Sequence, residues 1–514
     1  MEDTKREDPI APAATSLLRK QLVALGQEHI LAGLSSCTDE QRQALLTQLA
    51  SIDFQLFQRA LIDVVHTLGS SSSSSHTRSA SNPFPPPPFP HANWEGFEHW
   101  LPVADFEGEH SKGDTARWWL EGLHLVAAGH VAVLVLAGGQ GTRLGPNAPA
   151  VKGMLELDIP PKPRSLFELQ AEQLLLVQQL AALVMGTEVK LQIPWIVMTS
   201  DATDLPTRTF FEEKHFFGLG KSQVWFMKQT SLPCVELEKG HAILMDNPWK
   251  VALAPAGNGA VFSDLATAGI VERLADQGIQ YVQVYAVDNA LARVADPVFY
   301  GFVHERKADI GVKVVAKKFP KEAVGVVCLH SQGSNPNDQR DRGVYGVIEY
   351  SEMSEELRTA EDSSGQLLFR AAHICINMFS VEYLKKLMDS EFQLEFHPAI
   401  KRISHSKDPV PGKPNGIKLE QFIFDAFKYC DPKKVALLEV DRDEEFAPIK
   451  NAVGPGVPDS PATALDLLLA VHCRVHSTPG PDSSNIHHQE ESTNLTLLKA
   501  YVGGRSRTVA DTDI

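Results

Sequence analysis

The sequence has little cysteine, no long uninterrupted apolar run and no excess of basic residues. Its six cysteines contain no CxxC pair and share no regular spacing. We therefore expect reduced thiols in a cytoplasmic protein rather than a disulfide framework or a zinc site. The most apolar run, 123–139, is interrupted by His124 and His130 and is too short to cross a bilayer. The segment MEDTKREDPIAP lacks the apolar centre of a secretory signal.

The charge balance is acidic, with 64 Asp and Glu against 48 Lys and Arg and a formal net charge of −16. No basic field is present to attract a phosphate backbone, so we expect no nucleic-acid partner and no membrane partner. A small phosphorylated ligand needs only a few local cations and remains compatible with this balance. The length of 514 residues predicts two or three domains.

Composition and periodicity divide the chain into segments. Thr38 and Gln41 form an S/T-x-x-Q capping box ahead of a helical pattern. The Ser- and Pro-rich stretch 70–91 cannot build a core and predicts a linker. The predicted segments are a helical N-terminal region (1–69), a linker (70–100), a large central domain (101–440) and a small C-terminal domain (441–514).

Strand-like and helix-like segments alternate from about residue 123. The β-rich run Val131–Leu136 is followed by a helical pattern over Ser165–Met185. Further strands are predicted at Ile193–Met198 and Ile279–Val287. This order predicts an α/β fold with a mostly parallel sheet, and the apolar runs after Asp309 predict antiparallel additions to it.

The stretch VAVLVLAGGQGTRLG carries the clearest chemical signal. A predicted strand enters four glycines, whose backbone N–H groups can approach an anion closely, and Arg143 follows as a cation. This pattern favours a phosphate site over a purely structural turn. Leu144 stands where a dinucleotide fingerprint needs its third glycine, and no Gly-Lys-Ser or Gly-Lys-Thr occurs in this loop. Nicotinamide and Walker-type ATP sites are therefore poor fits.

The loop LAGGQGTRLG, followed by KGM at Lys152–Met154, resembles the signature of eukaryotic UDP-N-acetylhexosamine pyrophosphorylases. Further blocks resemble the same family in order along the chain: GQEHIL (Gly26–Leu31), PWIVMTS (Pro194–Ser200), FFGL (Phe216–Leu219), VDNALARVADPVFYGF (Val287–Phe302), VGVVC (Val324–Cys328), VIEYSE (Val347–Glu352), KPNGIKLEQFIFDAF (Lys413–Phe427) and EEFAPIKNA (Glu444–Ala452).

That resemblance implies a Rossmann-like, GT-A-like nucleotidyltransferase fold with a mixed sheet flanked by helices. It also implies that the segment 101–440 is the catalytic domain and binds the nucleotide sugar. It also implies a reaction in which UTP and N-acetylglucosamine 1-phosphate give UDP-N-acetylglucosamine and pyrophosphate, with Mg²⁺ or Mn²⁺ as cofactor. The implied partners are therefore two small-molecule substrates. The sugar phosphate attacks the α-phosphate directly, so the enzyme has to position groups and neutralise charge rather than supply a nucleophile.

The resemblance assigns roles position by position. The implied catalytic cations are Arg143, Lys152, Lys418 and Lys450. The implied nucleotide contacts are Leu136, Ala137, Gly138, Gly139, Gln229 and Gly257. The implied sugar contacts are Gly325, Glu349, His373, Phe422 and Phe424. The implied metal ligand is Asp288. Structural alternatives stay open: Asp288 suits a turn after a strand, the two phenylalanines suit a core, and lysines are commonly solvated.

The sequence departs from the family pattern at several positions. Six residues separate Gly145 from Lys152 where the family has four, and Val151 replaces a proline. Ala256 replaces an aspartate, and His373 replaces an asparagine that contacts the sugar. These changes keep two alternatives open: a catalytically weak or inactive nucleotide-binding relative, and an active uridylyltransferase for another hexose 1-phosphate. An NAD-dependent enzyme is the least favoured interpretation.

Overall fold

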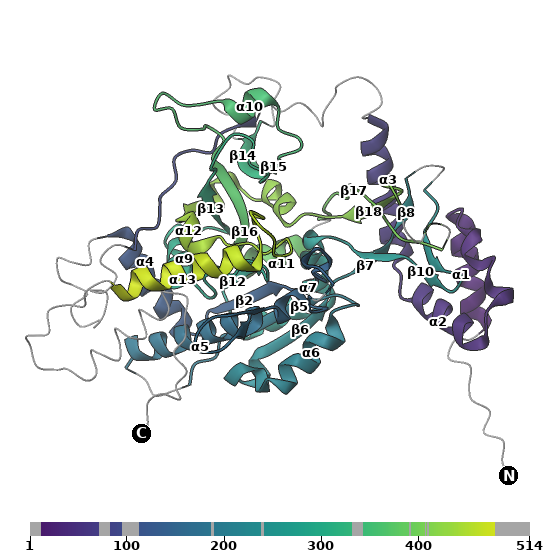
Figure 1. The fold of residues 1–514 in the computed structure, drawn as a ribbon, viewed down its shortest axis with the longest axis horizontal. Coiled ribbons are helices and arrows are strands. Elements are labelled where there is room, and N and C mark those ends of the chain that lie inside the picture. Colours follow the sequence, from purple (N-terminus) through teal and green to yellow (C-terminus); the bar gives the residue numbers. More distant parts are fainter. Residues whose placement is uncertain are drawn as a thin grey trace, which may run out of the picture. The chain divides into compact units, whose positions relative to one another are not determined.

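A computed structural model provides the fold of the chain (Figure 1). The structure describes residues 12–70, 83–94, 113–146, 148–186, 190–237, 241–331, 343–389, 392–406, 408 and 411–477.

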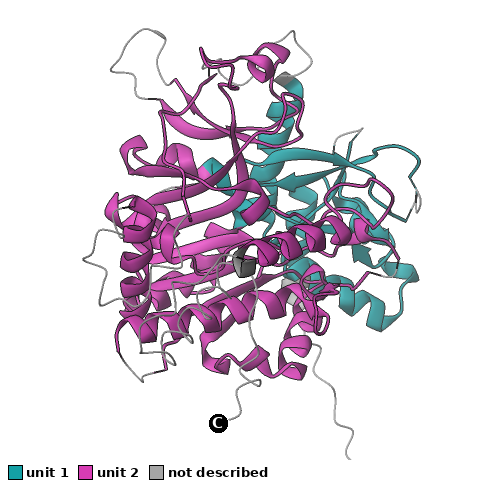
Figure 2. Ribbon diagram, turned by 60° about the vertical axis from the view of Figure 1, so that its left-hand side comes forward, with its two compact units in different colours: residues 1–80, 229–260, 393–425 teal, residues 81–228, 261–392, 426–514 magenta. Residues whose placement is uncertain are grey.

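The chain forms two compact units (Figure 2). Unit 1 comprises residues 1–80, 229–260 and 393–425, and unit 2 comprises 81–228, 261–392 and 426–514. The segments expected from the sequence were consecutive, whereas unit 1 is assembled from three separated stretches. The expected catalytic segment, 101–440, is consequently divided between the two units.

A mixed sheet of ten strands, counted among the described residues, forms the centre of unit 2. Seven strands follow the order β1-β14-β16-β12-β2-β5-β6. β13 pairs with β16 and β19, and β15 pairs with β14. Its parallel part consists of β2 (Val131–Leu136), β5 (Trp195–Thr199), β6 (Val224–Lys228) and β12 (Tyr281–Ala286). The remaining strands are β1 (Pro83–Phe84), β13 (Ile310–Ala316), β14 (Val326–His330), β15 (Val344–Ile348), β16 (Ala371–Ser380) and β19 (Val435–Glu439). β14, β15 and β16 pair antiparallel, which confirms the expected antiparallel additions.

Helices flank this sheet, as Figure 1 shows. The longer helices of unit 2 are α4 (Asp114–Ala127), α5 (Leu166–Val184), α6 (Asp204–Glu213), α9 (Pro297–Glu305), α11 (Val381–Asp389) and α13 (Pro461–Ser477). The shorter ones are α7 (Val261–Thr267), α8 (Ile270–Asp276), α10 (Glu355–Thr359) and α12 (Arg442–Glu445). A β-carbon on Gly122 of α4 would lie 1.8 Å from the carbonyl oxygen of Pro297, so glycine lets α4 and α9 meet backbone to backbone.

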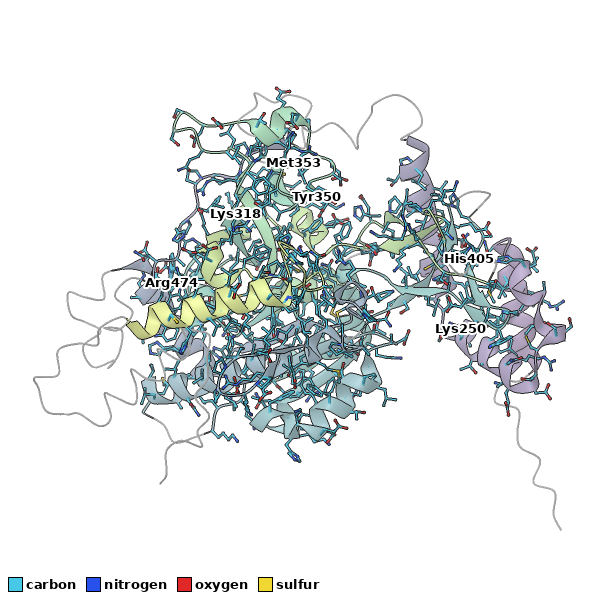
Figure 3. The ribbon with its side chains drawn as sticks, in the orientation of Figure 1. Lys250, Lys318, Tyr350, Met353, His405 and Arg474 are labelled. Atoms are coloured by element: carbon cyan, nitrogen blue, oxygen red, sulfur yellow. The ribbon has the colours of Figure 1, made fainter. Side chains whose placement is uncertain are left out.

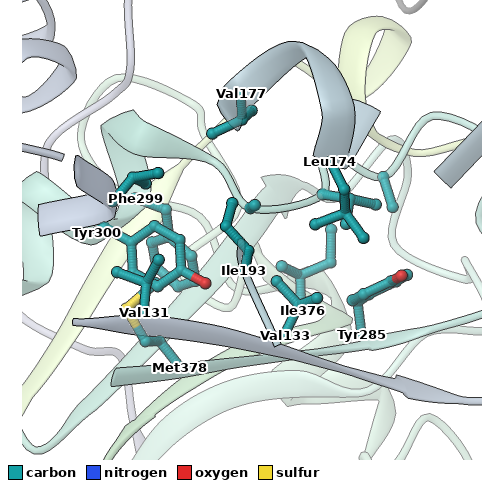
Figure 4. Packing of buried hydrophobic residues seen from close by; sticks show 14 of the residues in the cluster. Val131, Val133, Leu174, Val177, Ile193, Tyr285, Phe299, Tyr300, Ile376 and Met378 are labelled. Atoms are coloured by element: carbon teal, nitrogen blue, oxygen red, sulfur yellow. The ribbon is translucent and has the colours of Figure 1, made fainter. Parts of the chain in front are cut away.

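The core of unit 2 fills the space between the sheet and its helices. Alternate residues of β2, such as Val131 and Val133, pack against Leu174 and Val177 of α5 (Figure 4). The core also holds one fully buried ammonium, Lys313, which forms ion pairs of 2.5 Å with Asp296 and with Glu445. These pairs tie β13 to the first turn of α9 and to α12, because a buried charge has to be matched by opposite charge.

The Pro-rich stretch differs from its prediction. Residues 71–82 lie outside the described residues, but 83–91 are not a free linker. β1 pairs antiparallel with β14, and the backbone of Ala92 donates to the carbonyl oxygen of Glu439 at 2.9 Å. Prolines cannot donate to a strand ladder, which is why this segment is accommodated at the sheet edge. Composition alone indicated that the stretch builds no core of its own, but it could not indicate that part of the stretch pairs with β14.

Unit 1 begins with α1 (Pro12–Ala24), α2 (Asp39–Ala50) and α3 (Phe54–Ser70). The predicted capping box is confirmed, because Gln41 N donates to Thr38 Oγ1 and Thr38 N donates to Gln41 Oε1. A three-stranded sheet has the order β17 (His397–Lys401), β18 (Gly416–Glu420) and β8 (Val235–Glu236). Two strand pairs complete the unit, β7 (Ser231–Pro233) with β11 (Leu253–Pro255) and β9 (Met245–Asn247) with β10 (Lys250–Val251).

The predicted C-terminal domain is described only as far as residue 477, and the late segment Leu495–Gly504 lies outside the described residues. Leu468 and Val471 of α13 belong to one buried cluster with Ile449 and with Leu166 of α5. The described part of this segment therefore packs on unit 2. Figure 3 shows the side chains of the chain, including half-exposed Tyr350 and buried Met353 in the segment after β15.

Candidate functional site

The glycine loop follows β2 directly, at the carboxyl edge of the parallel strands. Ala137 N donates to Met198 O at 2.8 Å, and Ser200 Oγ donates to Gly138 O at 2.9 Å. These bonds fix the first residues of the loop against the end of β5. A β-carbon on Gly139 would meet no atom within 4 Å, so open space lies beside the backbone there. The carboxyl edge of such a sheet is the usual position of ligands in α/β folds.

Arg143 lies in the short 3₁₀ turn Thr142–Leu144 that follows the loop. Gly141 before the turn has φ +63°, and Gly145 after it has φ +96°, which are conformations that glycine adopts without strain. The side chain of Arg143 is exposed and forms no ion pair within the part of the chain that the structure describes. Its guanidinium is therefore available to an anion from solution.

Lys152 returns to this edge in spite of the longer connection before it. Its backbone N donates to Gly139 O at 3.4 Å, and the preceding Val151 is fully buried. A β-carbon on Gly153 would overlap the ring of Phe167 at 2.2 Å, so the backbone lies directly on the core. Packing on both sides of Lys152 thus holds its backbone in place.

The carboxylate of Asp288 meets the ammonium of Lys152 at the same edge. Asp288 follows β12, whose last residue, Ala286, pairs with Leu136 at the end of β2. Lys152 Nζ lies 2.9 Å from Asp288 Oδ2, with 13% and 21% of the two side chains exposed. Ile449 N donates to Asp288 O at 2.8 Å and fixes the turn. We call Gly138, Gly139, Arg143, Lys152 and Asp288 the β2–β12 edge.

Asp288 is the predicted metal ligand, and its surroundings limit the kind of metal it could hold. Among the described residues, no group of three or more His, Cys, Asp or Glu side chains is arranged to bind an ion. A site with a single protein carboxylate suits Mg²⁺, which usually keeps waters and takes its other oxygens from substrate phosphates. The donor set at Asp288 therefore fits such an ion and does not fit a structural zinc site.

Lys450 also belongs to unit 2 and lies one residue beyond Ile449. Its backbone N donates to Asp459 O at 2.7 Å, and its Nζ lies 3.9 Å from Asp459 Oδ2. Its side chain is 41% exposed. A pair this long and this exposed holds the ammonium weakly, so a phosphate can compete for it.

Three of the predicted sugar contacts are neighbours in unit 2. A β-carbon on Gly325 would lie 3.3 Å from Oε1 of Glu349, and His373 N donates to Gly325 O at 2.9 Å. His373 Nε2 donates to Asn377 Oδ1 at 3.0 Å. Burial lowers the pKa of His373 to about 4, and the bond to Asn377 offsets part of this effect. The imidazole is therefore neutral at pH 7, with Nδ1 as an acceptor.

A bulge in β16 determines how these groups are presented. Cys375 has φ +56°, and the register against β13 shifts between the pairs Val312–Asn377 and Val314–His373. Positive φ is uncommon for a residue with a side chain, and bulges often redirect side chains near functional sites. The amide nitrogen of Asn377 is buried without a hydrogen-bond partner among the described residues. We call Gly325, Glu349, His373, Cys375 and Asn377 the β16 bulge region.

Unit 1 contains the other predicted residues, Gln229, Gly257, Lys418, Phe422 and Phe424. Gln229 Nε2 donates to Gly257 O at 2.5 Å. A β-carbon on Gly257 would lie 2.3 Å from Gln421 O, and its φ is +86°. Glycine is therefore required at position 257 by the local backbone, in addition to its predicted contact with the nucleotide.

The two phenylalanines lie just after β18, the strand that carries Lys418 opposite Ala399. Their rings stack with centroids 5.1 Å apart, and Phe424 is buried whereas Phe422 is partly exposed. The core alternative therefore describes Phe424 better than Phe422.

Sequence reasoning missed the groups that support these residues. Ser200 was quoted only as the end of a strand block, yet its hydroxyl holds Gly138. The pair formed by His397 and Asp425 was not identified, because 28 positions separate the two residues. Ser200 could have been found, because a polar residue directly after a predicted strand often supports a site at the sheet edge. The His397–Asp425 pair gave no such signal in the sequence.

Comparisons with known proteins place the chain in a family. The model of the family described as UTP–glucose-1-phosphate uridylyltransferase matches residues 121–497. A probable UDP-N-acetylglucosamine pyrophosphorylase from Dictyostelium discoideum is 42% identical over 76% of this chain and 80% of its own length. The human UDP-N-acetylhexosamine pyrophosphorylase-like protein 1 is 39% identical over 89% of this chain and 84% of its own.

A solved structure is similar over nearly the whole chain. The UDP-N-acetylglucosamine pyrophosphorylase of Trypanosoma brucei, in complex with an inhibitor, superposes with a TM-score of 0.73 at 30% identity, covering 98% of this chain and 95% of its own. Among the described residues, no helix is long and apolar enough to span a bilayer. The chain belongs to the UTP–glucose-1-phosphate uridylyltransferase family, and its matched relatives include UDP-N-acetylglucosamine pyrophosphorylases.

Proposed function

We propose that this protein condenses UTP with N-acetylglucosamine 1-phosphate to give UDP-N-acetylglucosamine and pyrophosphate. An oxygen of the sugar phosphate forms a bond to the α-phosphorus of UTP, and the bond from that phosphorus to the β-phosphate bridging oxygen breaks. Pyrophosphate leaves with the electron pair, and no covalent bond to the protein forms. Such a transfer depends on the alignment of two anions and on neutralisation of the leaving charge.

The β2–β12 edge is the observation that carries this proposal. Open glycine backbone, the exposed guanidinium of Arg143 and the Lys152–Asp288 pair occur together at the carboxyl ends of neighbouring parallel strands. This combination suits a nucleoside triphosphate because it offers N–H donors, two cations and a carboxylate for a metal. A structural turn alone would leave both cations unexplained.

Arg143 and Lys152 are proposed to neutralise the β- and γ-phosphates, which leave as pyrophosphate. Lys152 is matched by Asp288 in this structure. The Lys152 ammonium can turn from Asp288 to a phosphate if a metal ion takes its place beside the carboxylate. No buried charge is then left without a partner. Asp288 would hold Mg²⁺ or Mn²⁺ together with phosphate oxygens, and the ion would supply charge neutralisation at the phosphates.

The nucleoside is proposed to lie on the first residues of the glycine loop. Leu136, Ala137 and Gly138 offer backbone groups there, and Ser200 fixes the peptide of Gly138. Gln229 is proposed to recognise the uracil edge and Gly257 to pack on the base or ribose. The bond between these two residues orients the Gln229 side chain amide before any ligand binds, which reduces the entropy lost on binding.

The acceptor sugar is proposed to contact Gly325, Glu349 and His373, with Phe422 and Phe424 against its acetyl group. Lys418 and Lys450 are proposed to contact the sugar phosphate and the α-phosphate. The carboxylate of Glu349 and the neutral ring of His373 can both accept hydrogen bonds from sugar hydroxyls. Ring faces such as that of Phe422 suit an acetyl methyl.

Pyrophosphate release is the test of this proposal. The purified full-length protein is given UTP, Mg²⁺ and, one at a time, the 1-phosphates of N-acetylglucosamine, N-acetylgalactosamine, glucose and galactose. The proposal expects the highest kcat/KM with N-acetylglucosamine 1-phosphate. No release with any sugar, while UTP still binds, would identify an inactive nucleotide-binding relative instead.

A second candidate is a uridylyltransferase for another hexose 1-phosphate. His373 favours it, because a histidine presents a different hydrogen-bonding edge to the sugar than the family's asparagine. Release only with glucose or galactose 1-phosphate in the same panel would support this candidate. The β2–β12 edge would then keep its role, and only the acceptor would change.

We also propose that the protein acts in the cytoplasm. Its six cysteines form no disulfide with one another among the described residues, and four of them are buried. Burial raises the pKa of the Cys234 and Cys328 thiols to about 12, so both stay protonated and unreactive. Fractionation of cells followed by detection of the protein with an antibody tests this location, and recovery with an organelle fraction would contradict it.

A further inference from the structure

Three aromatic rings form a continuous stack in unit 1. The rings of Phe422 and Phe424 lie 5.1 Å apart with an angle of 21° between their planes. The imidazole of His397, from β17, lies 4.7 Å from the ring of Phe422 at an angle of 32°. The Phe422 ring thus has two planar neighbours, one of them from a different segment of the chain.

The end of this stack is anchored by a carboxylate. His397 Nε2 donates to Asp425 Oδ2 at 2.6 Å, and the two side chains are 10% and 14% exposed. A hydrogen bond this short and this sheltered, to a charged acceptor, is among the stronger polar interactions in proteins. It fixes the rotation of the imidazole ring, and therefore the plane against which Phe422 packs.

The backbone beside the stack is fixed independently. Gln421 N donates to Ala256 O at 2.7 Å, and Ile423 N donates to Asn258 Oδ1 at 3.0 Å. The β-carbon of Phe422 is therefore positioned by its neighbours, so its side-chain torsions are the main freedom that remains. His397 restricts those torsions, since a tilted Phe422 would lose contact with the imidazole.

We infer that His397 and Asp425 are positioning residues that set the Phe422 ring so that the site distinguishes an N-acetylated hexosamine from the corresponding hexose. This inference rests on the proposed function, because it takes the Phe422–Phe424 pair as the surface that receives the acetyl group. Neither His397 nor Asp425 contacts substrate in this account. Their role is to keep one ring face in the orientation that packs on the acetyl methyl.

The test compares binding of UDP-N-acetylglucosamine and UDP-glucose by calorimetry, which requires no turnover. His397→Gln keeps an amide donor for Asp425 but removes the stacking ring, and Asp425→Asn keeps the shape but removes the charge. Each variant should weaken binding of UDP-N-acetylglucosamine about 3- to 10-fold and change UDP-glucose binding less than about 2-fold, as expected for the loss of one aromatic packing contact.

The matched control is His66→Gln, the same substitution at an exposed position of α3 in unit 1. It should leave both affinities at wild-type values. The double variant His397→Gln/Asp425→Asn should resemble the single variants, because both changes release the same ring. A purely structural role would instead lower both affinities by the same factor.

Two results would overturn the inference. One is an equal loss for the two nucleotide sugars, and the other is no change in either. Failure of the proposed function would be seen separately, as absence of pyrophosphate release by the wild-type protein in the sugar panel. The ratio of the two binding constants remains measurable in that case and still decides the role of His397.

Discussion

At the β2–β12 edge two opposite charges meet at 2.9 Å, whereas in the β16 bulge region a hydrogen bond joins two neutral side chains, His373 and Asn377. The first region is built from motifs that the sequence displays in a continuous order, a strand, a glycine loop and a lysine. The second depends on a bulge and on burial. The cations of the first region suit a phosphate, and the hydrogen-bond acceptors of the second, Glu349 and His373, suit sugar hydroxyls.

This contrast shows where variation is tolerated. Six residues instead of four precede Lys152, yet packing of Val151 and Gly153 still directs its side chain to Asp288. At His373 a single substitution alters the hydrogen-bonding groups themselves. Packing against the core can thus keep Lys152 in place when the loop before it is longer. A change of hydrogen-bond donors and acceptors, as at His373, should instead alter which sugar binds.

The largest expected effect is at the carboxylate of the β2–β12 edge. Asp288→Asn should lower kcat/KM about 1000-fold, because it removes the proposed metal ligand and leaves Lys152 without its partner. Pyrophosphate release at saturating UTP measures the loss. The control Asp276→Asn, at the exposed end of α8, should retain wild-type activity. An active Asp288→Asn enzyme would refute the role of this edge.

A smaller loss is expected at the cation. Lys152→Met should lower kcat/KM about 100-fold, since one preorganised charge on the leaving phosphates is lost while Arg143 remains. The control Lys221→Met changes a lysine that is 71% exposed and paired with Glu212. If both variants lost activity equally, Lys152 would have no special place in the reaction. Single-turnover kinetics, which isolate the chemical step, provide the measurement.

The β16 bulge region should respond in selectivity rather than in rate. His373→Asn should change the ratio of kcat/KM for N-acetylglucosamine 1-phosphate to that for glucose 1-phosphate about 10-fold, because one hydrogen-bonding edge that faces the sugar in this proposal is replaced. The KM for UTP should stay the same. An unchanged ratio with a raised KM for UTP would place His373 in the nucleotide site and erase the contrast between the two regions.

The smallest expected effect is on stability at low pH. The pKa of His373 is about 4 in the folded protein against 6.5 for an ordinary histidine. The unfolded chain therefore binds a proton there between pH 6.5 and 4 that the folded protein does not bind, so stability is complete above this window and falls within it. Urea unfolding should show a steeper fall for the wild type than for His373→Asn. Equal slopes would show that His373 titrates normally.

Much of the fold could be predicted from the sequence. The strand and helix periods located β2, α5, β5 and β12 to within two residues, because buried strands and helices impose those periods on the chain. The antiparallel additions followed from the apolar runs after α9. The pairing of 83–91 with β14 and β19 could not be predicted, because composition carries no information about such a partner.

The candidate site was predictable only in part. The glycine loop indicated Arg143 and the family resemblance indicated Lys152 and Asp288, and the adjacency of β2 and β12 brings the last two into contact. The bulge at Cys375 and the His397–Asp425 pair left no local pattern, because both depend on register and on contacts between distant segments. The roles of the individual site residues stay predictions.

If the Lys152–Asp288 pair is the triphosphate and metal site, Mg²⁺ should strengthen UTP binding through Asp288. Calorimetry on the wild-type protein and on Asp288→Asn, each with and without Mg²⁺, gives four dissociation constants. We expect Mg²⁺ to tighten UTP binding to the wild type at least about 10-fold and to have little effect on the variant. The same Mg²⁺ dependence in both proteins would contradict it.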